Sequence, residues 1–91
     1  MSMKTGILVD RVTGNGTTRT FELMYKLVDA PFIRMGDEYI NVGVKGVSNE
    51  YRWYYTPKDN CVTQHENDEP LGKGQFIDVI YFGEFEVDEV T

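Results

Sequence analysis

At 91 residues the chain is long enough for a single domain, 1–91, with one modest hydrophobic core, to which its 41% of apolar residues contribute. Its formal net charge of −6 disfavours direct binding to nucleic acid or to an anionic membrane, because both present phosphate groups. Its one cysteine, Cys61, excludes an internal disulfide, and no signal peptide or membrane span is predicted, so we expect a location in a reducing cytoplasm.

The first third of the chain predicts two strands joined by a tight turn. Residues 4–12 form the first strand candidate, and Asn15-Gly16 is a strong hairpin signal because both residues tolerate a positive φ. Residues 17–28 would then return beside the first strand, with threonines that favour extended backbone. The second half of that segment can also be read as two helical turns, so the alternative is an α+β fold with one short helix near 20–28.

The middle of the chain contains further strand candidates separated by turn residues. Pro31 breaks the chain, and a short apolar segment follows at 32–35. Residues 39–47 alternate between apolar and polar side chains, as in a strand with one buried face. Residues 50–56 are the most β-prone segment, because they are rich in aromatic side chains.

Alternation within this aromatic segment predicts which side chains enter the core. Tyr51, Trp53 and Tyr55 share the larger face and are expected to point inward. Arg52 and Tyr54 would then point outward. Tyrosine, tryptophan and arginine are enriched at interface hot spots, so the outward pair is a candidate for contact with a partner.

The last third combines a polar loop with a long strand. Residues 63–74 are mostly polar and acidic, which predicts an exposed loop. Residues 75–87 form the final strand, whose first half is almost continuously apolar and so is expected to be central and buried on both faces. In all, the sequence predicts a mainly β fold of about six strands in one small antiparallel sheet, sandwich or barrel.

The charge is distributed unevenly along the chain. Residues 1–58 hold eight Lys and Arg against six Asp and Glu and sum to +2, whereas residues 59–91 hold one lysine against nine carboxylates and sum to −8. On an extended strand Glu84, Glu86 and Asp88 would point the same way, about 6–7 Å apart. Such a row can solubilise a sheet edge, or it can bind a basic surface of another protein. In one form of that binding, the carboxylates mimic the phosphates of nucleic acid.

The candidate partner-binding residues are therefore the acidic side chains of the final strand, the acidic side chains of the loop, and the outward pair of the aromatic strand. They are Glu84, Glu86, Asp88, Glu66, Asp68, Glu69, Arg52 and Tyr54. The expected partner is a basic surface of another protein.

Candidate metal-binding and catalytic groups are few. Cys61 and His65 lie four residues apart and acidic side chains follow, but a structural zinc site needs four ligands, usually from two clusters. A Cys–His nucleophile would also need a third group to orient the histidine, and the sequence contains no recognisable one. We therefore predict a protein that is not an enzyme and that uses no metal or other cofactor.

In its short length, frequent turns and lack of catalytic motifs, the chain resembles the small acidic accessory proteins of bacteriophages. The resemblance is one of composition and transfers no individual residue. It implies a non-enzymatic binding module that inhibits or modulates a host protein, such as a defence protein, in the host cytoplasm. Docking would use the acidic C-terminal surface.

Two alternatives remain open at this point. One is a structural subunit of a virion or of a symmetric oligomer, because a thin core and an exposed sheet edge favour association. The other is a sponge for a small molecule or nucleotide, in which the Tyr/Trp cluster at 51–55 stacks on a base.

Overall fold

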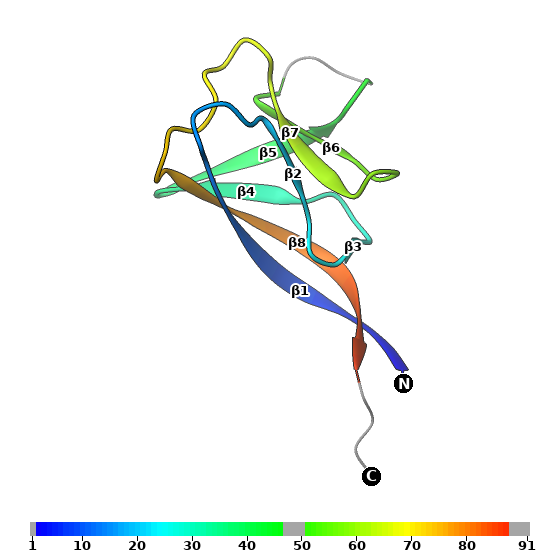
Figure 1. Ribbon diagram of the computed structural model, residues 1–91. Helices are drawn as coiled ribbons and strands as arrows, with labels where there is room; N and C mark the ends of the chain where they lie inside the picture. Colours follow the sequence, from blue (N-terminus) through cyan, green and yellow to red (C-terminus); the bar gives the residue numbers. More distant parts are fainter. Residues whose placement is uncertain (1, 47–50, 88–91) are drawn as a thin grey trace.

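The computed structural model describes residues 2–46 and 51–87, and these contain strands but no helix (Figure 1). The strands are β1 (Ser2–Thr13), β2 (Thr20–Glu22), β3 (Lys26–Leu27), β4 (Phe32–Met35), β5 (Glu38–Val44), β6 (Trp53–Thr56), β7 (Cys61–Gln64) and β8 (Phe76–Val87). The predicted β-rich fold is confirmed, and the alternative helix near 20–28 is not formed. Within the same residues there is no long apolar helix of the kind that crosses a membrane.

The strands form one curled sheet in the order β1-β8-β4-β5-β6-β7-β2, and β3 pairs with β8 beside β4. The first half of β5 pairs with β4 and its second half pairs with β6, so this strand carries the sheet around a bend into a half-barrel. The pairs are antiparallel except β5–β6, which is parallel. The sheet is therefore mixed, whereas the sequence predicted an antiparallel one, because strand direction depends on long-range topology.

The predicted N-terminal hairpin does not form. The partner of β1 is β8, which pairs with it from Ser2↔Val87 to Thr13↔Phe76. The turn that follows β1 is held elsewhere, because the Gly14 N–H donates to the Gln75 carbonyl at 2.7 Å. The chain then continues into β2, which pairs with β7 instead of β1.

The segment 17–28 forms two short strands instead of one long strand. β2 pairs with β7, and β3 pairs with β8. Between them, Asn60 fastens the chain through its amide, which accepts from the Leu27 N–H at 2.7 Å and donates to the Tyr25 carbonyl at 2.8 Å. This division, together with β7 at the start of the expected loop 63–74, explains why eight strands form where about six were predicted.

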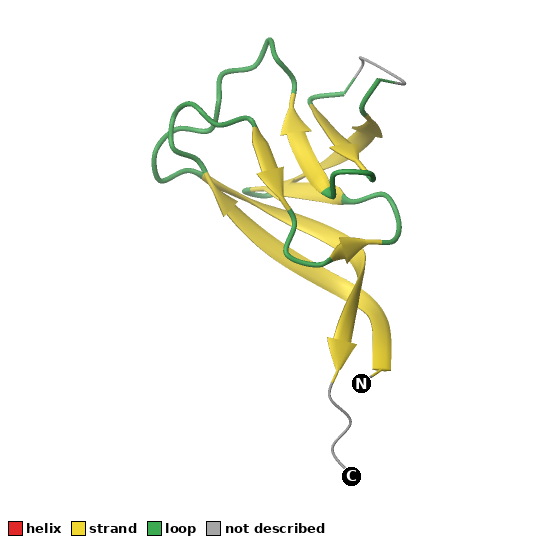
Figure 2. Ribbon diagram, turned by 45° about the vertical axis from the view of Figure 1, so that its right-hand side comes forward, coloured by secondary structure: helices red, strands yellow, loops and turns green. Residues whose placement is uncertain are grey.

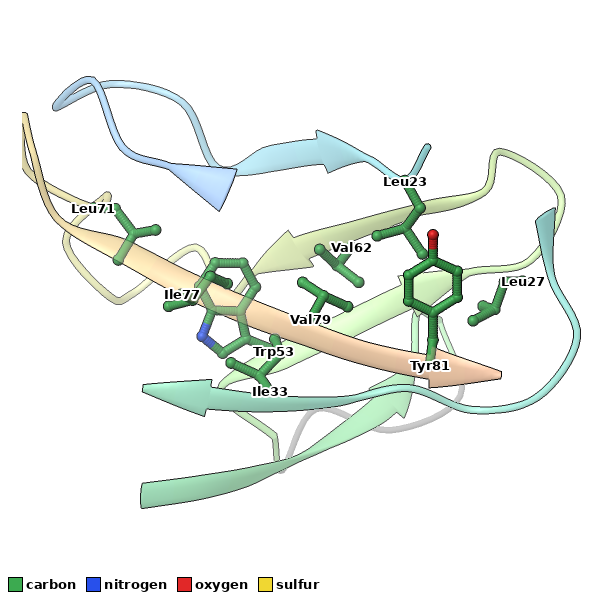
Figure 3. Close-up of a cluster of buried hydrophobic side chains, with 9 residues drawn as sticks. All are labelled: Leu23, Leu27, Ile33, Trp53, Val62, Leu71, Ile77, Val79 and Tyr81. Carbon is green, nitrogen blue, oxygen red and sulfur yellow. The ribbon is translucent and has the colours of Figure 1, made fainter. Parts of the chain in front are cut away.

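The hydrophobic core lies on the concave side of the sheet (Figure 3). Alternate residues of β8 enter it, and the facing strands contribute Trp53 and Val62, both fully buried. Leu71, from the expected exposed loop, closes one end. The cluster comprises Leu23, Leu27, Ile33, Trp53, Val62, Leu71, Ile77, Val79 and Tyr81.

The hydroxyl of Tyr81 is the polar end of this core. It donates to the Asp10 carboxylate at 3.0 Å and accepts from the Tyr25 N–H at 3.2 Å. Burial is the main cause that raises the pKa of Tyr81 to about 12. The bonds link β1, β8 and the segment between β2 and β3, so one side chain joins three parts of the fold.

β1 and β8 continue together beyond the rest of the sheet as a two-stranded ribbon (Figure 2). In this part their neighbour is β3, which reaches only Gly83 and Glu84 of β8. The ribbon therefore exposes both of its faces over much of its length.

We predict that Gly14 cannot be replaced by a larger residue, because it packs closely against Leu71. A Cβ atom there would overlap the backbone and Cβ of Leu71, so Gly14→Ala should lower the free energy of unfolding by about 1–3 kcal/mol. In the matched control, Gly6→Ala, the new Cβ would lie 3.6 Å from the Phe85 ring, which is an ordinary contact. Urea denaturation measures both, and equal stabilities for the two variants would contradict the prediction.

Candidate protein-binding surface

The convex side of the sheet presents a continuous set of apolar side chains. Along β8 the odd-numbered residues point into the core, so Ile80 and Phe82 point to the convex side. Their register partners on β1 are Val9 and Ile7, and Ile80 also pairs with Phe32 of β4. Residues directly opposite each other in a sheet share a face, so these side chains are neighbours.

We call this surface the outer face. Its apolar members are Met3, Ile7 and Val9 of β1, Phe32 of β4, Tyr39 of β5, and Phe76, Ile80 and Phe82 of β8. The exposed fraction is 76% for Ile7 and 41% for Phe82. The Phe32 and Tyr39 rings have centroids 5.8 Å apart, so the apolar surface extends from the edge strand to the fourth strand of the sheet.

The outer face is large for a chain of this size. The exposed fractions of its side chains correspond to on the order of 700 Å² of accessible surface, of which Met3 and Phe76, beyond the two charged ends, contribute about 200 Å². The remaining part is at the upper end of the about 300–600 Å² found for the largest apolar patch on a typical monomer. Patches of this size that are bordered by polar residues commonly mark interaction sites. The outer face is therefore the strongest candidate for a functional site in the described part of the chain.

One end of the outer face carries two arginines that share a buried carboxylate. Arg11 Nε lies 3.0 Å from Asp78 Oδ1, and Arg34 Nη2 lies 2.7 Å from Asp78 Oδ2. Hydrogen bonds from Arg11 and then from Arg34 hold the pKa of Asp78 below its usual range. The Arg11 guanidinium also lies 4.1 Å from the centroid of the Phe76 ring. This arginine end keeps a net charge of about +1.

The other end of the outer face is acidic. Glu84 and Glu86 lie on the same side of β8 as Ile80 and Phe82, and Glu86 is exposed. Lys26 of β3 stands opposite Glu84 in the register, but no ion pair among the described residues includes either glutamate. The predicted acidic row is thus present at its first two positions, and its third, Asp88, lies outside the described residues.

The remaining predicted partner-binding residues do not belong to the outer face, although Arg52 and Glu69 line a cavity beside its arginine end. Glu66, Asp68 and Glu69 belong to the loop at the opposite end of the molecule from the end of β8 (Figure 1). Arg52 is exposed but faces Asp68, with 3.7 Å between Nε and Oδ2. The structure therefore separates the two acidic groups that the sequence predicts to contact a basic partner.

Tyr54 does not point outward as predicted, because its side chain is only 7% exposed. The Tyr51 and His65 rings cover it, with centroids 6.2 Å and 6.0 Å away, and its hydroxyl accepts from the Tyr51 N–H at 3.0 Å. Trp53 is fully buried beneath the same strand. Trp53 and Tyr54 therefore offer no open ring face for a base, whereas Tyr51 of the same cluster is 38% exposed.

A half-open cavity of about 640 Å³ adjoins the arginine end. Its charged lining residues are Arg11, Arg34, Arg52, Glu69 and Asp78, so acidic groups offset most of the positive charge. The buried Gln64 side chain also borders it, and its amide donates to the Glu69 carbonyl at 2.8 Å. The lining therefore has no strong preference for an anion or a cation.

The cysteine and histidine that the sequence offered for chemistry have other surroundings. Cys61 is buried in β7, where it pairs with Glu22 and Thr56. His65 Nδ1 accepts from the Asn67 N–H at 3.0 Å. Among residues 2–46 and 51–87, no three His, Cys, Asp or Glu side chains are grouped so that they could hold a metal ion.

Comparison with known proteins found no relative of this chain. The sequence matches no protein-family model and no curated protein, and no solved structure matches the chain.

We predict that Asp78 stabilises the fold in a pH-dependent way. Asp78→Asn should lower the free energy of unfolding by about 1–3 kcal/mol at pH 7, because two guanidinium groups lose their shared carboxylate. A lowered folded-state pKa gives stability that is complete above the ordinary aspartate value of about 3.9 and is lost as the pH falls through the folded value. Urea unfolding from pH 7 to pH 2 should therefore show the difference from wild type shrinking with acid.

The control is Asp37→Asn in the exposed turn between β4 and β5, which should change stability by less than about 0.5 kcal/mol. A difference between wild type and Asp78→Asn that stays constant down to pH 2 would show that the carboxylate charge contributes nothing.

Proposed function

We propose that this protein is a non-enzymatic binding module that docks onto another protein chain through its outer face. The observation that carries the proposal is the contiguous exposed apolar surface on β1, β8, β4 and β5, which is bordered by an arginine end and an acidic end. Burial of such a surface favours association because it removes apolar area from water. The charged ends select the partner and its orientation.

The proposal changes the expected contact surface. Glu84 and Glu86 remain part of it, next to the apolar centre, whereas the loop carboxylates and Tyr54 do not. The apolar side chains supply most of the affinity, since exposed charge pairs contribute little in water. Two classes of partner suit such a surface: a different protein with a basic group beside an apolar patch, or a second copy of this chain.

The first class corresponds to the phage-type inhibitor inferred from composition. In that form of the proposal the partner is a basic protein of the host cytoplasm, and occupation of its surface inhibits it. The second class corresponds to the symmetric oligomer or virion subunit. Both use the same face of the sheet, so one substitution tests the binding module in either form.

The test compares Phe82→Lys with Met24→Lys. Both replace an exposed apolar side chain with lysine, but Met24 lies in the segment between β2 and β3, outside the outer face. Tagged protein is used to capture partners from a lysate of the source cells, and differently tagged copies are mixed to detect self-association. We expect Phe82→Lys to reduce the captured partner at least about tenfold and Met24→Lys to leave it unchanged.

Far-UV circular dichroism first establishes that both variants are folded. Equal capture by wild type, Phe82→Lys and Met24→Lys in both assays would show that the outer face binds no protein.

A further inference from the structure

The outer face has opposite charges at its two ends, and this arrangement makes it complementary to itself. Asp78 with its two arginines and Glu84 are six residues apart on β8, or about 20 Å along the strand. Ile80 and Phe82 lie between them on the same side of the strand. An apolar centre is thus placed midway between a basic end and an acidic end.

We propose that two copies of the chain pack outer face against outer face around a two-fold axis, with the acidic end of each copy on the arginine end of the other. This inference rests on the proposed function and names its partner. The axis passes between Ile80 and Phe82, so that β8 of one copy crosses β8 of the other in the antiparallel sense. The result is a sandwich of two sheets whose shared layer consists of the apolar side chains of both outer faces.

Charge supports this pairing. At the arginine end, two guanidinium groups share the single carboxylate of Asp78, which leaves about one positive charge. At the acidic end, Glu84 and Glu86 stand beside Lys26, which leaves about one negative charge. A two-fold axis matches these ends twice, because every contact in an isologous interface is repeated. The match opposes the general repulsion between two chains that each carry a net charge of −6.

The area also suits a second copy. A standard interface takes about 800 Å² from each partner, and the outer face offers on the order of 700 Å² before its polar border is counted. Four aromatic side chains, Phe32, Tyr39, Phe76 and Phe82, contribute to it.

Packing of faces is favoured over pairing of sheet edges. β1 is an edge strand, and two β1 strands could extend the sheet by backbone hydrogen bonds. Such a dimer would leave Phe32 and Tyr39 uncovered, because β4 and β5 are the third and fourth strands from that edge. Packing of the outer faces covers both.

Sedimentation velocity over a range of protein concentrations tests the proposal. Wild type is expected to change from monomer to dimer with increasing concentration. Phe32→Lys should raise the dimer dissociation constant at least about 100-fold, because it places a charge in the shared apolar layer two strands from the edge. Met24→Lys should dimerise as wild type does. A chain that stays monomeric at about 500 µM, or a dimer unaffected by Phe32→Lys, would overturn the proposal.

A second pair of variants tests the orientation. Glu84→Lys combined with Glu86→Lys places like charges against the arginine end of the other copy and should raise the dissociation constant about tenfold or more. Asp59→Lys combined with Glu66→Lys makes the same change in net charge at two exposed positions outside the outer face and outside the cavity beside its arginine end, and should not weaken the dimer. Equal weakening by the two double variants would rule out the antiparallel match of ends.

The two proposals can fail separately. If the wild-type chain is monomeric but captures a lysate partner that Phe82→Lys loses, the protein is a binding module whose partner is not a second copy of itself. A wild-type chain that neither dimerises nor captures a partner through this face would remove both.

Discussion

The ladder between β1 and β8 determines the rest of this structure. Over twelve residue pairs it fixes which side chains of both strands face the core and which face outward. A shift of one residue in this register would turn Ile77, Val79 and Tyr81 to the outer face and turn Asp78 with its arginines into the apolar core. Because β8 also pairs with β3 and β4, the same register sets where those strands lie. The core, the ion-paired arginine end and the outer face therefore depend on a single alignment.

Local features of the sequence predicted the strands well and their partners poorly. Alternation and aromatic content located β5, β6 and β8 because these signals arise within a few residues. The turn at Asn15-Gly16 was misread because its hydrogen bonds go to Leu71 and Gln75, which are distant in the sequence. The interruption of 17–28 likewise depends on Asn60, whose amide holds backbone groups more than thirty residues away.

The candidate surface was predicted only at one end, through Glu84 and Glu86. The continuous apolar run at the start of β8 was read as a strand buried on both faces, whereas Phe82 is substantially exposed. Composition cannot distinguish a strand that is buried on both faces from a strand with one exposed apolar face. An apolar side chain that binds a partner and one that is buried in the monomer are chemically alike. The useful signal was the length of the chain, since a small domain has too few residues to cover two faces of a central strand.

The pairing of the first strand with the last also has a consequence for synthesis. On the ribosome β1 emerges early, but its partner is made about seventy residues later. Until β8 is released, the core lacks Ile77, Val79 and Tyr81, and the sheet lacks the strand that joins β1, β3 and β4. Such non-local topology folds slowly and all at once, so the nascent chain stays unfolded, with the apolar residues of β1 accessible to chaperones, until translation has passed this strand.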